Sequence, residues 1–247
     1  MKIVETIREE ERATVDELAA RFDISRETIR RDLTKLANSG KIQKVHGGAI
    51  LPRVFGEGSF GQRMSENSEA KMRIASKAVE LFGAGETLFI DTGSTTLYFA
   101  EKLIEVSGLT IITNSTEIAK TISSSDQGNR IFLLGGEYNA DNRQTAGTLV
   151  ASQIRLFRVH HTVLTVGALD VRTGAMDFNI EEAQVAHAMI EQSETLTVLV
   201  DSSKFNKLAS FEVCPLSRID QLVCDIMPPD ELREALEAAG VEIFVAP

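Results

Sequence analysis

Five short polar segments in the second half of the sequence have residue types that suit the binding of a phosphate group. In the richest of them, residues 91–96 (D-T-G-S-T-T), the glycine lets the backbone approach a phosphate, while hydroxyls and the N–H groups of a starting helix can donate to it. Each segment by itself is equally well explained as a helix cap or a turn. The other four segments are 113–115 (T-N-S), 135–137 (G-G-E), 167–170 (G-A-L-D) and 201–204 (D-S-S-K).

An apolar run precedes each of these segments and predicts the strand that positions it. A helical segment over 71–82 leads into the first run, and amphipathic helices separate most of the others. Short apolar strands alternating with helices are typical of a mainly parallel α/β sheet covered on both faces, and ligands bind such sheets at the carboxyl ends of the strands. The five segments are therefore expected to form one anion-binding cup. The predicted strands are 87–90, 109–113, 130–134, 162–166, 196–200, 221–224 and 241–246.

Several other chemistries are not indicated. The chain contains neither G-x-x-x-x-G-K-[ST] nor G-x-G-x-x-G, so no nucleotide hydrolysis and no cofactor are expected. His160 and His161 would point to opposite faces of a strand, which argues against a metal site. Cys214 and Cys224 form no C-x-x-C pair, there is no signal peptide, and no apolar run approaches the ~20 residues that span a bilayer. We expect a cytoplasmic protein.

A second functional pattern lies near the N-terminus. Thr14 and Glu17 have capping-box spacing, and an apolar stripe follows them at helical spacing. Residues 23–24 form a turn, and Ser25 is a good N-cap for a second helix whose stripe includes Ile29 and Leu33. Two short helices joined by a tight turn are the arrangement with which a helix-turn-helix enters the DNA major groove.

The outward arc of the second helix carries side chains that can read DNA, because arginine can bind guanine, glutamate can accept from cytosine, and threonine can contact a base. The following segment 41–48 (K-I-Q-K-V-H-G-G) is a short basic hairpin that would lie along the phosphates as a wing. The alternative is a solvated, salt-bridged helix followed by an unrelated turn. The candidate DNA contacts are Ser25, Arg26, Glu27, Thr28, Arg30, Arg31, Thr34, Lys35, Lys41, Lys44 and His46.

The charge distribution favours DNA binding although the whole chain has a net charge of −10. Residues 21–53 contain eight Lys or Arg against three Asp or Glu, a net charge of +5, whereas residues 54–247 carry fifteen against twenty-seven, a net charge of −12. A basic arm on an acidic body concentrates attraction to phosphate in the arm. We predict a winged helix-turn-helix domain over 1–50, a linker over 51–68 and an α/β domain over 69–247, since residues 50–68 mix proline, glycine and serine without a clear period.

Two stretches, I-S-R-E-T-I-R-R-D-L and V-H-G-G-A, resemble the signature of the DeoR family of bacterial transcription regulators. The resemblance continues in order through D-T-G-S-T-T, T-N-S, L-G-G, F-N-I-E-E-A-Q-V-A-H-A-M-I and V-D-S-S-K-F. It implies an N-terminal winged helix-turn-helix and a C-terminal effector domain that resembles sugar-phosphate isomerases. It also implies that Ser94, Thr95 and Thr96 hold a phosphate near Lys204.

By the same resemblance, Asp91, Asn114, Glu181 and Glu182 would contact sugar hydroxyls, and Lys71 and Arg143 would be further anion contacts. The polar segments add Thr92 and four glycines to these candidate contacts. The full set of candidate effector contacts is Lys71, Asp91, Thr92, Gly93, Ser94, Thr95, Thr96, Asn114, Gly135, Gly136, Arg143, Gly167, Glu181, Glu182 and Lys204.

Binding without turnover is expected at this cup. Isomerases of the similar type carry an acidic cluster after the fourth strand, where this sequence has G-A-L-D with fewer carboxylates, and isomerisation needs a carboxylate to move a proton. We predict a repressor of carbohydrate or polyol catabolism genes, a dimer or tetramer released from operator DNA by a phosphorylated sugar or polyol. The alternatives are an isomerase-type enzyme with a DNA-binding arm and a structural DNA-binding protein without a ligand.

Overall fold

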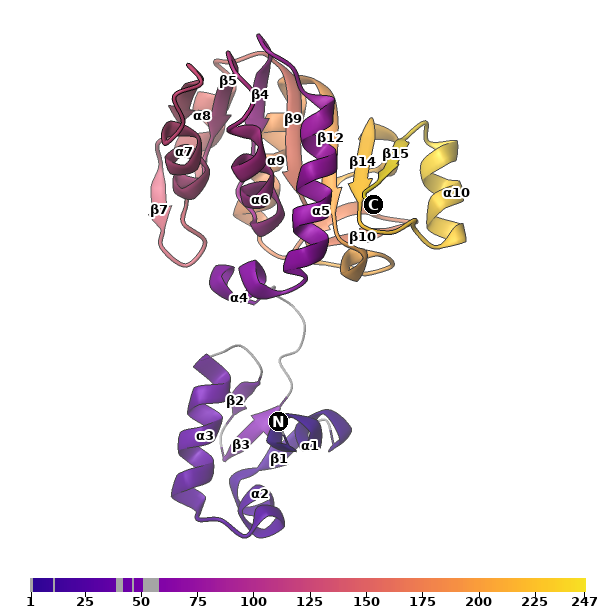
Figure 1. Cartoon of the computed structure of the whole chain (residues 1–247). Helices are drawn as coiled ribbons and strands as arrows, with labels where there is room; N and C mark the ends of the chain where they lie inside the picture. The colour runs from indigo at the N-terminus through magenta and orange to yellow at the C-terminus, as the bar shows by residue number, and fades with distance from the viewer. Residues whose placement is uncertain (1, 11, 39–41, 46, 51–57) are drawn as a thin grey trace. The chain divides into compact units, whose positions relative to one another are not determined.

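The computed structural model describes residues 2–10, 12–38, 42–45, 47–50 and 58–247 (Figure 1). The chain divides into two compact units, Met1–Gln62 and Arg63–Pro247. This division falls inside the segment 51–68 expected to be the linker, and a short helix, α4 (Phe60–Ser65), contains it. None of the described helices is long and apolar enough to cross a membrane.

The first unit is a winged helix-turn-helix, as predicted. Its three short strands form an antiparallel sheet in the order β1-β3-β2. A methyl group at Gly48 would lie 2.3 Å from the backbone oxygen of Ala13, so glycine is needed where β3 meets β1. The elements are α1 (Lys2–Glu10), β1 (Arg12–Thr14), α2 (Val15–Phe22), α3 (Arg26–Asn38), β2 (Gln43–Val45) and β3 (Gly48–Ile50).

Local sequence signals explain the two helices of the motif. The capping box at the start of α2 is present, because Thr14 and Glu17 bond each other's backbone N–H groups. The helix ends at Asp23, whose left-handed backbone (φ 53°) makes the turn, and the Ser25 hydroxyl accepts the N–H of Thr28 at 3.2 Å to cap α3. The inward stripes then bury their apolar side chains in one core, which includes Ile7, Leu18, Ile29, Leu33 and Ile42.

The second unit is built on a seven-stranded, fully parallel sheet in the order β15-β14-β12-β9-β4-β5-β6. Every strand predicted from an apolar run belongs to it, so the mainly parallel sheet is confirmed. The strands are β4 (Thr87–Ile90), β5 (Thr110–Thr113), β6 (Arg130–Leu133), β9 (Val159–Thr165), β12 (Ser193–Val200), β14 (Gln221–Cys224) and β15 (Glu242–Val245).

Helices cover both faces of this sheet (Figure 1). Three of them pack side by side on one face, α5 (Ser68–Ala78), α6 (Ser94–Leu103) and α7 (Thr116–Ser123). On the other face, α8 (Thr148–Ile154) and α9 (Ile180–Glu191) contact each other, and α10 (Asp230–Ala238) lies beside β15. The helix predicted over 71–82 is α5 followed by a single 3₁₀ turn, Val79–Leu81.

Two small antiparallel sheets were not predicted. A hairpin of β7 (Glu137–Asn139) and β8 (Gln144–Ala146) follows β6, and β10 (Ala168–Asp170), β11 (Gly174–Asp177) and β13 (Phe211–Cys214) form a three-stranded sheet. These strands are three or four residues long, too short to show an alternating pattern in the sequence. The β7–β8 hairpin contributes side chains to the site described next.

Candidate DNA-binding surface and effector site

The helix α3 presents its polar arc to solvent. Arg26, Glu27, Arg30, Arg31 and Lys35 are exposed, together with Ser25 and Thr34, while Thr28 is half-buried. On the wing, Lys44 of β2 is exposed, whereas Lys41 and His46 lie outside the described residues. The surface therefore presents four cationic side chains of α3 and one of the wing on the described part of the arm.

Two contacts fix this surface. The Nζ atom of Lys44 donates to the Thr34 hydroxyl at 3.0 Å, which joins the wing to α3. The Nε atom of Arg26 lies 2.8 Å from the Asp16 carboxylate of α2, and both side chains are well exposed. The second contact orients the start of α3, although an exposed ion pair of this kind contributes at most about 1 kcal/mol.

The segments predicted to form a cup follow five neighbouring strands of the parallel sheet. The chain runs from β4 to β5 and β6 on one side, and then crosses to β9 and β12 on the other side of β4. The carboxyl ends of β4 and β9 therefore flank the point where the strand order reverses, which is where such sheets bind ligands. Residues 91–97, directly after β4, are all buried.

The helix α6 begins at this reversal point. Its N-cap is Gly93, and among the described residues no side chain caps it. A methyl group on Gly93 would lie 2.1 Å from the Thr165 side chain of β9, so glycine allows the loop to pack against that strand. The first N–H groups of a helix have no intrahelical partner, so those of Ser94, Thr95 and Thr96 are oriented for an anion.

A buried amide network lies beside this helix start. Glu182, buried on α9, accepts hydrogen bonds from Asn142 Nδ2 at 2.6 Å and from Gln144 Nε2 at 2.7 Å. The Oε1 atom of Gln144 in turn accepts from Asn114 Nδ2 at 3.2 Å. Asn142 and Gln144 were missed by sequence reasoning, although they flank the candidate Arg143 in the same loop.

Asp91 has an unusual electrostatic environment. Burial raises the pKa of this carboxyl well above its usual range, and the negative charges of Glu182 and Asp177 raise it further. The hydrogen bond from the N–H of Thr92, 2.7 Å from Asp91 Oδ1, and the one with Asn114 oppose the rise in pKa. The site thus gathers carboxyl and amide groups that can donate and accept hydrogen bonds with hydroxyl groups of a ligand.

The segment that opens the second unit is bonded to the same region. Arg63 Nη2 donates to Asn142 Oδ1 at 3.0 Å, and the buried Lys71 donates to the backbone oxygen of Arg63 at 2.5 Å. The Tyr98 hydroxyl donates to the backbone oxygen of Met64 at 2.9 Å.

A further hydrogen bond joins this segment to the end of β12. The Asn67 amide donates to the Asp201 carboxylate at 3.0 Å. Residues 63–71 are therefore bonded to side chains of the cup on both sides of the point where the strand order reverses.

Some candidate residues have other contacts. Gly135 exchanges hydrogen bonds with Gln153 at 3.0 and 2.7 Å. Methyl groups on Gly136 and Gly167 would lie 2.6 Å from the Ala146 oxygen and 2.7 Å from the Phe178 ring, so both glycines permit close packing.

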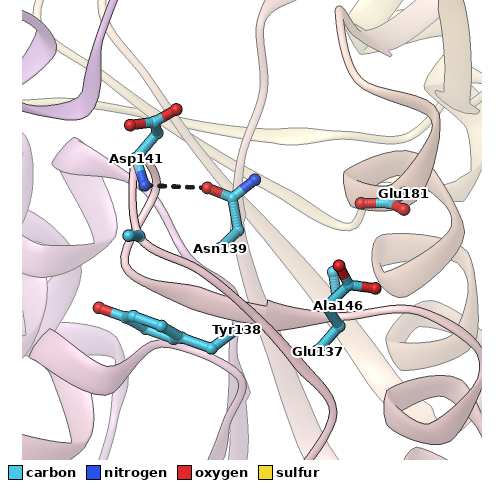
Figure 2. A pocket seen from close by; sticks show the side chains of 7 residues that line it. Glu137, Tyr138, Asn139, Asp141, Ala146 and Glu181 are labelled. Carbon is cyan, nitrogen blue, oxygen red and sulfur yellow. Dashed lines mark hydrogen bonds between the residues drawn. The ribbon is translucent and has the colours of Figure 1, made fainter.

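Three charged candidates lie around the cup in different surroundings. Arg143 is exposed and pairs with Glu117 at 3.5 Å. Lys204 is half-buried in the 3₁₀ turn after β12. Glu181 is exposed and lines a pocket of about 320 Å³ with the β7–β8 hairpin. Figure 2 shows Glu181 reaching this pocket from α9 and Glu137, Tyr138 and Asp141 from the hairpin.

The cysteines and histidines have structural surroundings. Cys214 and Cys224 are buried, and burial raises the pKa of each thiol to about 12. His160 accepts the N–H of Thr87 at 3.0 Å, while His161 lies 3.4 Å from a Glu86 oxygen. In the described ranges, no group of three or more His, Cys, Asp or Glu side chains could hold a metal ion.

A winged helix-turn-helix followed by a parallel α/β domain with a polar, anion-compatible cup defines a DNA-binding regulator with its own sensor domain. Residues 1–54 match the DeoR-like helix-turn-helix domain, and residues 66–226 match the DeoR C terminal sensor domain. The chain belongs to the DeoR family of transcription regulators.

Similar proteins include regulators from several bacteria. The glycerol-3-phosphate regulon repressor of Escherichia coli is 32% identical over 98% of this chain and 95% of its own length. The L-fucose operon activator of Haemophilus influenzae is 33% identical over 95% and 94%. The repressor GlcR of Bacillus subtilis is 30% identical over 98% and 93%. With these relatives and its helix-turn-helix domain, the chain is a transcriptional regulator rather than an enzyme.

Among solved structures, the chain is similar to ribose 5-phosphate isomerase A of Methanocaldococcus jannaschii, with a TM-score of 0.43 and 18% identity. The similarity covers 58% of this chain and 57% of that one.

Proposed function

We propose that this regulator represses genes of carbohydrate or polyol catabolism and leaves its operator when a phosphorylated sugar or polyol binds the cup. The observation that carries the effector class is the start of α6 beside β9, where buried hydroxyls and helix N–H groups converge. The names of the similar repressors, one of them for a glycerol-3-phosphate regulon, support the same class of effector. The protein acts in the cytoplasm, where such metabolites and DNA meet.

On the DNA side, α3 enters the major groove and its arc reads base edges, with Arg31 as the central candidate. The wing contacts phosphates through Lys44, together with Lys41 and His46. Modules of this size usually bind repeated half-sites as dimers, so the active species is a dimer or tetramer held by the second unit.

On the effector side, Ser94, Thr95 and Thr96 bind the phosphate with Lys204 and Lys71 as nearby cations. Asp91, Asn114 and Glu182 contact ligand hydroxyls, and Asn142 and Gln144 keep the Glu182 carboxylate oriented. Gly93 permits the close approach of the loop. Thr92, Gly135, Gly136, Arg143, Gly167 and Glu181 complete the wall of the cup.

In this switch the effector acts on the hydrogen bonds of residues 63–71, which overlap the end of the segment 51–68 that leads to the DNA-binding arm. An effector that engages the cup changes the partners available to Arg63 and Asn67. The two arms of an oligomer then change their relative orientation and no longer match the half-site spacing. A ligand can regulate in this way if it binds the DNA-competent and DNA-released states unequally.

The test combines a ligand screen with a matched pair of variants. A thermal-shift panel of glycerol, pentose and hexose phosphates identifies the effector, because a ligand at 100 times its Kd stabilises the fold by about 2.7 kcal/mol. The double variant Thr95→Ala, Lys204→Ala should bind operator like the wild type but resist release by that ligand.

The control double variant Thr148→Ala, Lys207→Ala alters a threonine at the start of another glycine-capped helix and an exposed lysine. It should release the operator normally. Operator release by effector from the Thr95→Ala, Lys204→Ala protein would contradict the assigned phosphate site.

A further inference from the structure

The outer strand β6 is less buried than the inner strands of its sheet. Parallel strands are normally buried on both faces, and β4, β5 and β14 each contain three consecutive buried residues. In β6 (R-I-F-L) all four residues remain partly or fully exposed, although three of them are apolar. This end of the sheet therefore presents apolar surface to solvent.

Apolar side chains of the neighbouring helix extend this surface. The ring of Phe157, just after α8, packs against that of Phe132 with 5.3 Å between centroids, and Gln153 of α8 donates to the Gly135 oxygen at 2.7 Å. Both contacts place α8 beside β6. We define the β6 patch as the side chains of Phe132, Leu133, Leu149 and Leu156. Their exposed fractions range from 37% for Phe132 to 81% for Leu156.

The backbone of β6 also has an open edge. The N–H of Arg130 bonds to the Leu109 oxygen, and the N–H of Leu134 bonds to the Thr113 oxygen. Residues of a parallel strand alternate in the side to which they bond, so Ile131 and Leu133 direct their N–H and C=O groups away from β5. The strand contains neither lysine nor proline, the residues that commonly protect an edge.

We propose that the β6 patch binds a second copy of this chain, with the two β6 strands pairing antiparallel about a two-fold axis at Phe132. In that register Ile131 of each copy lies opposite Leu133 of the other, so all the outward backbone groups are paired. Phe132 meets its own counterpart across the axis. The two Arg130 side chains lie at opposite ends of the paired strands, which avoids repulsion between them.

The second copy is favoured as the occupant because a two-fold axis makes one patch complementary to itself. The opposite edge of the sheet does not offer the same surface. In β15 the exposed residue is the charged Glu242, and the three apolar residues are half-buried. The inference rests on the proposed function in one respect: binding to repeated half-sites requires an oligomer that carries two DNA-binding arms.

Disulfide trapping of the full-length protein tests the register. In an antiparallel pair of this kind the facing Cα atoms are about 4.5 Å apart, a distance that a disulfide can bridge. Phe132→Cys should therefore give a covalent dimer on mild oxidation. The native Cys214 and Cys224 give little background because both are buried with a raised thiol pKa of about 12.

Two single-cysteine controls make this test specific. Arg130→Cys lies on the same strand but about 13 Å from its counterpart in the proposed register, given about 3.3 Å per residue. Leu208→Cys is exposed but lies outside the β6 patch. Neither should form a covalent dimer, and a dimer through Arg130→Cys would overturn the register.

A second measurement does not depend on cysteine chemistry. Leu133→Lys places a charge next to the two-fold axis, opposite Ile131 of the other copy, and should raise the dimer dissociation constant at least tenfold in sedimentation analysis. Leu208→Lys should leave it unchanged, and circular dichroism should show that both variants are folded. If Leu133→Lys fails to fold, disulfide trapping alone decides.

A wild type that is monomeric at micromolar concentration would overturn the inference. The inference would also be overturned if the wild type is a dimer but Phe132→Cys forms no disulfide and Leu133→Lys leaves the dimer dissociation constant unchanged. In the latter case the proposed repressor function stands, because its own test, effector-dependent release of the operator, is measured on the unmodified protein.

Discussion

The exposed arc of α3 contains the side chains with the clearest expected roles. Arg31 is exposed and belongs to the helix that a helix-turn-helix inserts into the major groove. Arg31→Ala should weaken operator binding by about 1–3 kcal/mol and relax the sequence preference at one base pair, as measured by fluorescence anisotropy with operator variants. Arg172→Ala, an exposed arginine of the sensor domain, is the control. Equal losses on all sequences would contradict base reading by Arg31.

Lys44 on the wing is expected to act through charge. Lys44→Ala should weaken binding to specific and random DNA about equally. It should also reduce the slope of log affinity against log salt by about 0.9, because one phosphate contact is lost. The hydrogen bond of Lys44 to Thr34 orients the lysine beside α3. An unchanged salt slope would show that this wing residue does not contact a phosphate.

The raised pKa of Asp91 predicts how the stability of the fold changes with pH. Its pKa is raised in the folded protein, so the folded state binds the proton more tightly than the unfolded state, whose pKa is near 3.8. The contribution of Asp91 to stability is therefore fully present below pH 3.8 and declines as the pH rises through the folded-state pKa.

Asp91→Asn should remove this decline and raise the free energy of unfolding near neutral pH. Urea unfolding across a pH series measures it, with the exposed Asp126→Asn as the control. A parallel pH dependence in wild type and Asp91→Asn would contradict the raised pKa.

Among the elements, α4 and the start of α5 connect the cup with the chain that leads to the DNA arm. Tyr98 of α6 bonds the backbone of Met64 without belonging to the candidate effector contacts. Tyr98→Phe removes one hydrogen bond, a change of about 0.5–1.5 kcal/mol. It should reduce the factor by which effector weakens operator binding, while the effector affinity measured without DNA stays within twofold.

Hydrogen exchange of residues 63–67 should be faster in Tyr98→Phe than in the wild type. Ser124→Ala, which removes an exposed hydrogen bond of 2.7 Å to the backbone oxygen of Thr121, is the control and should behave like the wild type in both measurements. A full effector response in Tyr98→Phe would exclude the α4 attachment from the switch.

In the whole molecule, thermodynamic linkage requires effector and operator to change each other's binding affinity by the same factor. If saturating effector weakens operator binding by some factor, saturating operator must weaken effector binding by the same factor. Calorimetric titration of effector into the protein, with and without operator, measures the second factor, and anisotropy measures the first. Equal effector affinity in the two titrations would rule out the proposed switch.

Elements whose signals are local can be predicted from the amino-acid sequence alone. The capping box at Thr14, the cap at Ser25 and the apolar stripes predicted the helix-turn-helix, because a helix end depends on residues three or four positions apart. Apolar runs predicted all seven parallel strands, since the inner strands are buried on both faces and the edge strands β6 and β15 also contain three consecutive apolar residues. The polar segments after these strands predicted a cup at one edge of the sheet, and its role in binding an effector stays a prediction.

The assembly of the cup depends on contacts between residues far apart in the sequence, which sequence patterns do not predict. The Glu182 carboxylate accepts hydrogen bonds from Asn142 and Gln144, which are about forty residues away in sequence. The Asp201 carboxylate accepts one from Asn67, which is still farther away in sequence. Amide side chains look alike in any loop, and their roles follow from which strands become neighbours. The same applies to Gly136 and Gly167, whose need for glycine arises from packing against distant atoms, and to β6, whose apolar residues are identical in character to core residues until the sheet order leaves them at the edge.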